Sequence, residues 1–458
     1  MDPTPPPLTN PQPVPSGAAP VTATVTSNAV GSIGADFVAF SLEKGELVAR
    51  AFSLSDPNMV TLFTRFGAGI VRIGGSSVDD VIWTPGGQGR ISKQISKVDI
   101  DNFAPFLQKT GWQVIYGINL AQNTEAAAAE EAAYAAKMLG SSIYCFSLGN
   151  EPAAYDISTY PVPTGYAKWN YATFKGRWVS LRKAIMDAVP GATFAGPDAT
   201  YGSVSNYTVP FANDPDVRPL KLLSQHYYRL NDNDVRTMDA LLTTPDPKLQ
   251  PLLVTVKSAA DGLGAPFRIT ETNSATGGGQ AGVSDVYGSA LWALDHMFLV
   301  AKGGASGLHF HSGGQSNYTP FTTPGSQLTD IRPEFYAMVF FKMAGQGSVV
   351  EASFNAASGN ISIYSIKTSS GMSVMFVNKE VSQSFKVALQ LPVSVSRATV
   401  LQLTGPGLTS TMGITIQNAA ISVTTGLGTM DAAYSAPVSG QNATVYVPAL
   451  SAVLVKAS

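Results

Sequence analysis

The sequence is dominated by a repeat of short apolar runs and longer helical segments between residues 34 and 345. Each run is largely apolar, which is typical of a parallel strand that is buried on both faces. Alternation of such strands with helical segments is the pattern of successive β-α units. Eight runs are present, at residues 36–42, 70–74, 112–120, 142–149, 193–197, 220–228, 267–270 and 307–311. Eight parallel strands predict an α/β fold whose sheet closes into a (β/α)8, or TIM, barrel.

Helical patterns fill several of the intervals between these runs. Residues 124–139 are rich in Ala and Glu, which are strong helix formers, and residues 164–189 carry a long amphipathic pattern. Residues 284–301 and 333–344 are strongly apolar. We expect these segments to form helices that cover the outside of the barrel.

The two ends of the chain differ from the barrel region in their pattern. After Gly345 the helical periodicity disappears and Thr, Val and Ser alternate, which predicts a smaller C-terminal β-sandwich at residues 346–458. A similar alternation begins at Val21, so residues 21–30 are predicted to supply a strand that pairs an otherwise open edge of that sandwich. The remaining predicted units are a Pro-rich tether at residues 1–20 and the barrel at residues 31–345.

Composition excludes several classes of function. The chain has 458 residues, of which 45% are apolar and 13% charged, so it can bury a sizeable core. Its formal net charge of −2 gives no general attraction to nucleic acid, anionic lipid or a heavily sulfated polymer. The single cysteine, Cys145, lies in an apolar run and has no partner for an intrachain disulfide, so we interpret it as a buried strand residue.

The Pro-rich start of the chain contains neither the apolar core of a signal peptide nor a membrane span. Met1 directly before this segment predicts that an export signal has been removed, which favours a secreted or periplasmic protein. The sequence gives no indication of an oligomeric state.

Two glutamates follow apolar runs at positions where a barrel carries its chemistry, the carboxyl ends of the strands. The fourth run ends in Gly149-Asn150-Glu151-Pro152, and the seventh ends in Thr270-Glu271. Strands four and seven face each other across the mouth of an eight-stranded barrel, so we expect the two carboxyl groups to meet there.

A facing pair of carboxyl groups suits the hydrolysis of an acetal. One group protonates the leaving oxygen and the other stabilises or traps the oxocarbenium-like carbon. A separation of about 5 Å predicts direct attack and retained configuration, whereas a wider gap admits water and inverts it. The alternative is that such glutamates pair with arginines at the rim; either motif alone is only suggestive, and the pairing is what favours catalysis.

The barrel region also resembles glycoside hydrolase family 79, which contains β-glucuronidases and heparanase-like enzymes. The resemblance rests on six segments in order: Phe40-Ser41-Leu42-Glu43, Val71-Arg72-Ile73-Gly74-Gly75, Gly149-Asn150-Glu151-Pro152, His226-Tyr227-Tyr228, Glu271-Thr272-Asn273-Ser274 with Gly277-Gly278-Gly279, and Asn317-Tyr318. It implies that Glu151 is the general acid/base and Glu271 the nucleophile. It further implies three supporting roles, in which Asn150 binds the sugar 2-hydroxyl, Tyr227 donates to the nucleophile and Arg72 lies beneath it. A structural ion pair within the barrel is the alternative for Arg72.

The same resemblance implies how a glucuronate is recognised. The backbone amides of Gly277 and Gly278, together with Tyr318, would hold its carboxylate, because glycines let the main chain approach an anion closely. An ordinary glycine-rich loop is the alternative. Glu43 and Asp79 would accept hydrogen bonds from sugar hydroxyls, although Glu46 and Asp80 are neighbouring candidates for the same roles.

Other motifs support no cofactor or metal. His309 and His311 flank Phe310 and point to the same side of the eighth strand, but a closed ligand set for a metal is not evident, so we interpret them as structural. A phosphate-binding loop or dinucleotide fingerprint is likewise not apparent.

The sequence therefore predicts a retaining exo-β-glucuronidase whose partner is a glycan or glycoconjugate that carries glucuronic acid. No cluster of Lys and Arg lies near the predicted site loops, which favours exo action over heparanase-like endo cleavage of glycosaminoglycans. A catalytically silent carbohydrate-binding protein is the second alternative. The aglycone, tolerance of 4-O-methylation and any sugar binding by the sandwich stay open.

Overall fold

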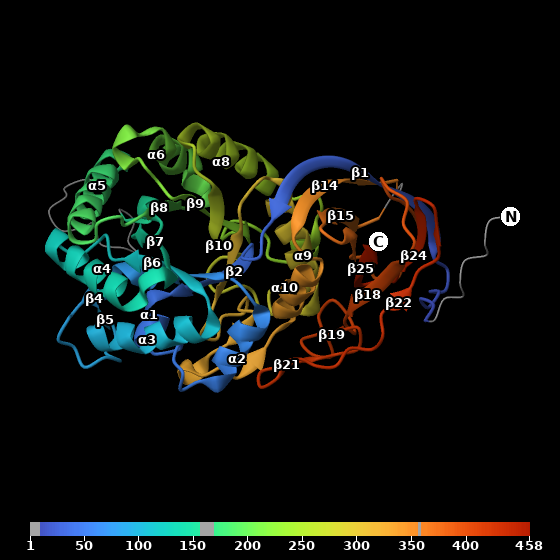
Figure 1. Ribbon diagram of the computed structural model, residues 1–458, viewed down its shortest axis with the longest axis horizontal. Coiled ribbons are helices and arrows are strands. Elements are labelled where there is room, and N and C mark those ends of the chain that lie inside the picture. Colours follow the sequence, from blue (N-terminus) through green and yellow to red (C-terminus); the bar gives the residue numbers. More distant parts are fainter. Residues whose placement is uncertain (1–9, 156–168, 356–358) are drawn as a thin grey trace.

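The computed structural model describes residues 10–155, 169–355 and 359–458, and Figure 1 shows a barrel beside a curled β-sheet. Eight strands form a closed, all-parallel barrel, which confirms the predicted TIM barrel. In barrel order they are β2 (Val38–Glu43), β3 (Ile70–Gly74), β6 (Gln113–Ile118), β7 (Ile143–Leu148), β8 (Phe194–Ala199), β9 (Leu222–Leu230), β10 (Phe267–Ala275) and β11 (Leu308–Ser312). Five strands continue past their predicted ends, β2 and β11 by one residue, β8 and β9 by two and β10 by five, so Glu271 lies within β10.

Helices surround this barrel (Figure 1). They are α1 (Lys44–Val48), α2 (Pro57–Phe66), α3 (Lys97–Thr110), α4 (Glu125–Leu139), α5 (Tyr171–Ala188), α6 (Val209–Asn213), α7 (Met238–Leu242), α8 (Leu249–Leu263), α9 (Tyr287–Lys302) and α10 (Pro333–Met343). Four of them coincide with the predicted helical segments, although residues 164–168 of one prediction lie outside the described residues. The start of α4 illustrates why the helices begin where they do: the Thr124 hydroxyl accepts a hydrogen bond from the Ala127 amide.

Aromatic side chains fill the space between the barrel and its helices on one side. Phe40 of β2 is completely buried, stacks on Trp112 with ring centroids 5.4 Å apart, and lies 5.2 Å from Phe63 of α2. Truncation of such a buried ring to alanine typically costs about 3–5 kcal/mol. This packing anchors α2 against the strand that leads to Glu43.

Cys145 lies in β7 and is completely buried, in agreement with the sequence interpretation. It packs in an apolar cluster with side chains of other barrel strands, among them Ile70, Ile115 and Leu222. Burial raises the pKa of its thiol well above the ordinary value. Such a thiol is not a nucleophile at neutral pH.

The C-terminal part is a curled sheet that takes in the first strand of the chain. Its order is β19-β18-β25-β16-β15-β14-β1-β17-β24-β23, with β22 beside β18. β1 (Ala19–Ile33) pairs antiparallel with β14 (Gly347–Phe354) and parallel with β17 (Phe385–Gln390). The other strands are β15 (Ile361–Thr368), β16 (Gly371–Asn378), β18 (Ala398–Thr404), β19 (Thr415–Ile416), β22 (Tyr434–Ser435), β23 (Val438–Ser439), β24 (Asn442–Val447) and β25 (Ser451–Ala457). Short two-stranded ladders lie outside this sheet and the barrel: β4 (Ile82–Trp83) with β5 (Gln94–Ile95), β12 (Phe321–Thr322) with β13 (Asp330–Ile331), and β20 (Ile421–Ser422) with β21 (Gly426–Leu427).

One face of the sheet packs on barrel helices. The ring of Tyr364 in β15 stacks on Phe298 of α9 with centroids 4.7 Å apart. A buried ion pair crosses the same contact, between Lys379 and Asp295, and Tyr364 donates a hydrogen bond of 3.1 Å to Asp295. The sheet thus contributes to the surroundings of α9, which packs behind β10.

The end of the predicted tether is held in place rather than free. The side chain of Gln12 is buried, and its carbonyl accepts a hydrogen bond of 2.9 Å from the Tyr446 amide in β24. Asn10 donates to the Ala432 carbonyl. Residues 1–9 of the tether lie outside the described part of the chain. In the described ranges, the helices are too short or too polar to cross a lipid bilayer.

Candidate active site

Glu151 and Glu271 meet at the carboxyl end of the barrel. Oxygen atoms of the two carboxyl groups and a ring nitrogen of His226 all lie within 4.8 Å of one another. Glu151 lies three residues after the end of β7, has a left-handed backbone with φ of 47°, and is followed by Pro152 at the start of a short 3-10 helix. This turn exposes 23% of the Glu151 side chain, whereas only 8% of the Glu271 side chain is exposed.

Glu271 accepts hydrogen bonds on both of its carboxylate oxygens. Its Oε2 accepts a hydrogen bond of 2.9 Å from Arg72, and its Oε1 accepts one of 3.0 Å from the Tyr228 hydroxyl. Burial alone raises the pKa of Glu271. The positive charges of His311, His226 and Arg72, together with the Tyr228 hydrogen bond, lower the pKa by more than burial raises it, so the net shift is downward. The carboxylate is therefore ionised and fixed in one orientation.

Arg72 lies beneath Glu271, as the family resemblance implies. Its side chain is completely buried and donates to three more groups besides Glu271: Asn150 Oδ1 at 2.8 Å, Ser41 Oγ at 3.0 Å and Asp198 Oδ2 at 3.2 Å. An alanine Cβ at Gly74 would come within 2.8 Å of the guanidinium carbon, so the glycine after Ile73 makes room for the arginine.

Asn150 is oriented by this arginine. Since its Oδ1 accepts from Arg72, the side-chain amide nitrogen points elsewhere and donates to no acceptor among the described residues. Asn150 is buried, directly before Glu151 in the sequence. Its amide is thus free to donate to a bound group beside both carboxyl groups.

Glu151 contacts His226, a residue to which the sequence analysis gave no role of its own. His226 Nδ1 lies 3.0 Å from Glu151 Oε1. Burial lowers the pKa of His226, but the charge of Glu271 and the contacts with Asp198 and Glu151 raise it more, to about 9. His226 is therefore an imidazolium at neutral pH.

The prediction that Tyr227 donates to Glu271 is wrong. Tyr227 donates instead to Asp246, at 2.6 Å, and stacks on His296 with ring centroids 5.7 Å apart. Side chains alternate along a strand, so His226 and Tyr228 point into the barrel mouth while Tyr227 between them points out. Tyr228 is the donor to the nucleophile candidate, and burial beside Glu271 raises its pKa well above the ordinary value, which keeps it protonated.

The predicted contact of Asp79 with a sugar hydroxyl stays a prediction, and the structure shows which protein donors surround its carboxylate. Asp79 is 2% exposed, and its carboxylate accepts from the amides of Leu120, Ala121 and Asn150 and from the Tyr155 hydroxyl. Four donors fill the acceptor positions of a carboxylate. Asp79 therefore fixes the backbone that leads to Glu151. Its neighbour Asp80 is more exposed and lies 3.7 Å from Lys93.

Glu43 lies at the barrel mouth with a third of its side chain exposed. It accepts hydrogen bonds from the amides of Ser76 and Ser77, and His311 Nε2 is 3.4 Å away. Burial raises the pKa of Glu43, but His311 and Ser77 lower it to a net value below the ordinary one. A Cβ at Gly75 would come within 2.5 Å of this carboxyl group, so the second glycine of the Gly74-Gly75 pair makes room for it.

His309 and His311 belong to different environments. His309 is completely buried and accepts a hydrogen bond of 3.0 Å from Arg268, and burial holds its pKa well below the ordinary value. His311 is at the site, with its Nδ1 3.7 Å from Glu271 Oε2. Burial lowers the pKa of His311, but Glu271 and Glu43 raise it to a net value above the ordinary one. The structural interpretation fits the surroundings of His309, whereas His311 faces the carboxyl groups of Glu43 and Glu271 at the site.

The glycine turn after β10 adjoins Tyr318. Gly277 and Gly278 have φ values of 65° and 86°, which favour glycine. The carbonyl of Gly278 accepts from the amides of Asn317 and Tyr318, at 2.7 and 3.4 Å. The amides of Gly277 and Gly278 themselves donate to no acceptor in the described part of the chain. The rings of Tyr318 and Tyr228 have centroids 6.0 Å apart, and Tyr228 donates to Glu271, so this turn lies near the two glutamates.

The cluster of Glu151, His226 and Glu271 has the residue types of a metal site. Arg72 at 2.9 Å from Glu271 and the imidazolium of His226 already supply two positive charges there. A cation would have to displace these contacts. The charge arrangement therefore fits a pair of reacting carboxyl groups better than a metal centre.

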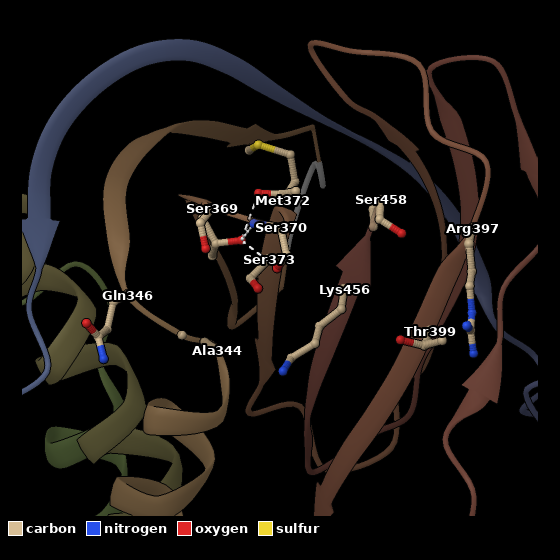
Figure 2. Close-up of a pocket in the computed structure, with 14 residues that line it drawn as sticks. Ala344, Gln346, Ser369, Ser370, Met372, Ser373, Arg397, Thr399, Lys456 and Ser458 are labelled. Carbon is tan, nitrogen blue, oxygen red and sulfur yellow. Dashed lines mark hydrogen bonds between the residues drawn. The ribbon is translucent and has the colours of Figure 1, made fainter. Parts of the chain in front are cut away.

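A hollow of about 620 Å³ lies outside the barrel, in the C-terminal part (Figure 2). It is bordered by the turn after α10 and by β16, β18 and β25, with Lys456 and Thr399 among its lining side chains. None of its lining residues belongs to the barrel strands, and none is aromatic, so it offers no ring on which a sugar can stack. The barrel mouth is therefore the candidate active site.

Comparison with known proteins finds similar sequences. No protein-family model matches the chain. A β-glucuronidase of Aspergillus niger is 25% identical over 352 residues, which cover 68% of this chain and 64% of the relative. A β-glucuronidase of Neurospora crassa is 23% identical over 197 residues, 39% of this chain and 35% of the relative. The matches thus span less than two thirds of the length of these relatives.

Solved structures share the fold over nearly the whole chain. A 4-O-α-L-rhamnosyl-β-D-glucuronidase from Fusarium oxysporum superimposes with a TM-score of 0.80 and 19% identity, covering 96% of this chain and all of the other. A family 51 arabinofuranosidase from Xanthomonas axonopodis gives a TM-score of 0.66 at 13% identity, with 96% and 100% coverage. The chain is therefore similar in sequence to proteins named β-glucuronidase and has the barrel-and-sandwich fold of known glycoside hydrolases.

Proposed function

We propose that the protein is a retaining exo-β-glucuronidase. The observation that carries this proposal is the pair of carboxyl groups, Glu151 and Glu271, whose oxygen atoms lie within 4.8 Å of each other. This spacing matches the roughly 5–5.5 Å of retaining glycosidases and leaves too little room for the water of an inverting reaction. The similarity in sequence to fungal β-glucuronidases supports the choice of sugar.

In the first step, the Glu271 carboxylate attacks the anomeric carbon while Glu151 gives its proton to the glycosidic oxygen. The bond from the anomeric carbon to that oxygen breaks, and the aglycone leaves as an alcohol. In the second step, Glu151 takes a proton from water, whose oxygen attacks the anomeric carbon and displaces Glu271. The free side-chain amide of Asn150 is placed to donate to the 2-hydroxyl, where a hydrogen bond strengthens as positive charge develops at the neighbouring carbon.

The sugar carboxylate would lie at the glycine turn and Tyr318. The amides of Gly277 and Gly278 have no described acceptor, and two adjacent backbone donors suit an anion. The positive side chains nearest the reacting groups, Arg72 and His226, already contact carboxylates of the protein. The substrate carboxylate therefore requires donors other than these cations.

Exo action is favoured because the arginines near the site already donate to acceptors of the protein. Arg332 donates to the carbonyls of Ser316 and Asn317, and Arg236 donates to Thr276. Both hold the loops that border the pocket, so these guanidinium groups are committed to protein acceptors. An endo enzyme on sulfated chains would need free cations along its groove.

The test compares hydrolysis of matched aryl β-glucuronide and aryl β-glucoside by the wild type and by Glu271→Gln. We expect a preference for the glucuronide and a loss of about 10⁴-fold or more in the variant. Preferred glucoside turnover would contradict the carboxylate pocket, whereas sugar binding without turnover of aryl or longer glucuronides would favour the silent binding protein. Product anomer, followed by NMR at early times, distinguishes retention from inversion.

A further inference from the structure

Asp198 is a buried carboxylate at the carboxyl end of β8 to which no role has been given so far. It is 1% exposed and has a φ of 54°, an uncommon conformation for a residue other than glycine. Its amide donates 2.9 Å to the Ser224 hydroxyl of the neighbouring strand. The backbone is thus held in a conformation that directs both the carbonyl and the carboxylate of Asp198 toward the site.

The first set of contacts leads to Glu151. The Asp198 carbonyl accepts a hydrogen bond of 2.9 Å from the Glu151 amide. Its Oδ1 lies 3.5 Å from His226 Nε2, an ion-pair distance, while the other ring nitrogen lies 3.0 Å from Glu151 Oε1. Carboxylates face both nitrogens of the ring, and only an imidazolium can direct a proton toward each of them.

The second set of contacts leads to Glu271. Asp198 Oδ2 accepts from one nitrogen of Arg72 at 3.2 Å, and the other nitrogen of the same guanidinium donates to Glu271 at 2.9 Å. Asp198 Oδ1 also accepts from the hydroxyl of Thr270 at 2.7 Å, and Thr270 directly precedes Glu271 in β10. A single carboxylate therefore contacts both the cation and the backbone neighbour of the nucleophile candidate.

Charge balance gives a reason for this arrangement. Arg72 and His226 are both buried, and a buried cation without a partner is strongly unfavourable. Glu151 must lose its charge when it is protonated, and Glu271 loses its charge in the covalent intermediate. Asp198 is the neighbour that keeps its negative charge through both steps: burial would raise its pKa, but Arg72, His226 and Thr270 hold it far below the ordinary value.

We propose that Asp198 is a positioning residue for both catalytic glutamates, orienting Glu271 through Arg72 and Thr270 and Glu151 through His226 and its own carbonyl. The inference rests on the proposed function, since it takes these glutamates as the reacting pair. It adds a permanent buried anion that holds the two cations of the site in place while the catalytic charges change.

The pH profile of kcat/KM distinguishes the loss of the Asp198 charge from simple structural damage. Removal of a buried anion favours ionisation of every neighbouring carboxyl group. The titratable and charged groups that face Asp198 from the surrounding elements are Arg72, Cys145, Glu151, His226, Glu271 and His309. In Asp198→Asn, both limbs of the bell-shaped pH profile of kcat/KM are therefore expected to move to lower pH.

The experiment measures pH profiles for the wild type, Asp198→Asn and the control Asp246→Asn. Asp246 is also a buried barrel aspartate, bonded to Tyr227 and 3.6 Å from Arg229, but it lies on the outward side of β9. We expect Asp198→Asn to lower kcat at least tenfold and to shift both limbs, and Asp246→Asn to leave the limbs at their wild-type positions. If both limbs of the pH profile of Asp198→Asn stay at their wild-type positions, the proposal is overturned, whatever the loss of rate. If just one of the two limbs shifts, the role shared between the two glutamates is overturned.

A second variant covers the case in which Asp198→Asn does not fold. Asp198→Glu keeps the charge and displaces it, so it should retain the wild-type limbs while kcat falls; wild-type kcat in this variant overturns the positioning role. The profiles are measured with whichever aryl β-glycoside the wild type hydrolyses. A wild type that prefers glucoside contradicts the proposed function, whereas unshifted limbs contradict only the role of Asp198.

Discussion

Tyr227 and Tyr228 are adjacent on β9, yet their hydroxyl groups donate to carboxylates on opposite faces of the strand, Asp246 and Glu271 respectively. The two hydrogen bonds measure 2.6 and 3.0 Å, and both tyrosines pack against aromatic neighbours. The same chemical group thus supports packing at one position and a reacting carboxylate at the next. This pair offers a matched comparison.

Tyr228→Phe should lower kcat by about 10–100-fold, because a hydrogen bond to a charged group is worth about 1.5–3 kcal/mol. Tyr227→Phe removes the same oxygen from the outward side, so it should lower the free energy of unfolding by roughly 1–3 kcal/mol and leave kcat unchanged. Steady-state kinetics and denaturant unfolding of both variants check this. Equal losses of kcat would show that the two hydroxyl groups do not differ in role.

Tyr318→Phe is expected to reduce the preference for glucuronide over glucoside. If the hydroxyl donates to the sugar carboxylate, its removal costs about tenfold in kcat/KM for the glucuronide. Hydrolysis of the glucoside should change little, since that sugar carries no carboxylate. Parallel losses on the two substrates would assign Tyr318 to general packing of the pocket.

Lys379→Met should destabilise the fold by about 3–5 kcal/mol, because it leaves Asp295 buried without its cation. Lys379 is completely buried and also donates to Thr244 and Ser362, at 2.9 and 3.0 Å. The control is Lys257→Met, which breaks an exposed pair with Asp261 and should cost no more than about 1 kcal/mol. Denaturant unfolding gives both values; similar costs would show that the pair between sheet and barrel is not needed for stability.

His226 should make stability depend on pH on the alkaline side. Its pKa is raised from 6.5 to about 9 in the folded protein, so the native state binds this proton more tightly than the unfolded chain does. The contribution is fully present below pH 6.5 and is lost as the pH rises through the folded value. The free energy of unfolding should fall by up to ~3 kcal/mol across this window. Denaturant unfolding of His226→Gln should give a flatter curve; a slope equal to that of the wild type would contradict the raised pKa.

The barrel was predictable because each of its strands has a recognisable pattern within a few consecutive residues. Two-sided burial makes every strand of the barrel a short apolar run, and each run in the sequence corresponds to an observed strand. Glu151 and Glu271 were found by the rule that polar residues at strand ends line the mouth. The same rule applied to the run at 193–197 would have found Asp198, which directly follows it.

Other parts of the site depend on information that the sequence does not display. Side chains in β9 point alternately into and out of the barrel mouth, and this alternation places Tyr228 rather than Tyr227 against Glu271. The sequence His226-Tyr227-Tyr228 has no alternation of polar and apolar residues from which the inward side could be predicted. Asp79 and Asp80 look alike in the sequence. In the structure, the carboxylate of Asp79 accepts hydrogen bonds from four donors that lie in distant segments of the chain. The roles of Asn150, Gly277, Gly278 and Tyr318 toward a sugar stay predictions.

The pairing of β1 with β14 has a consequence for how the molecule is made. Ala23 lies opposite Phe354, so the barrel is inserted between two neighbours of one sheet. As the chain leaves the ribosome, β1 emerges before the barrel, whereas its partners β14 and β17 emerge after it. Contacts this distant in sequence form slowly and leave strand edges uncovered meanwhile. Until β14 and β17 have been made, the edges of β1 are therefore open to aggregation and to binding by chaperones.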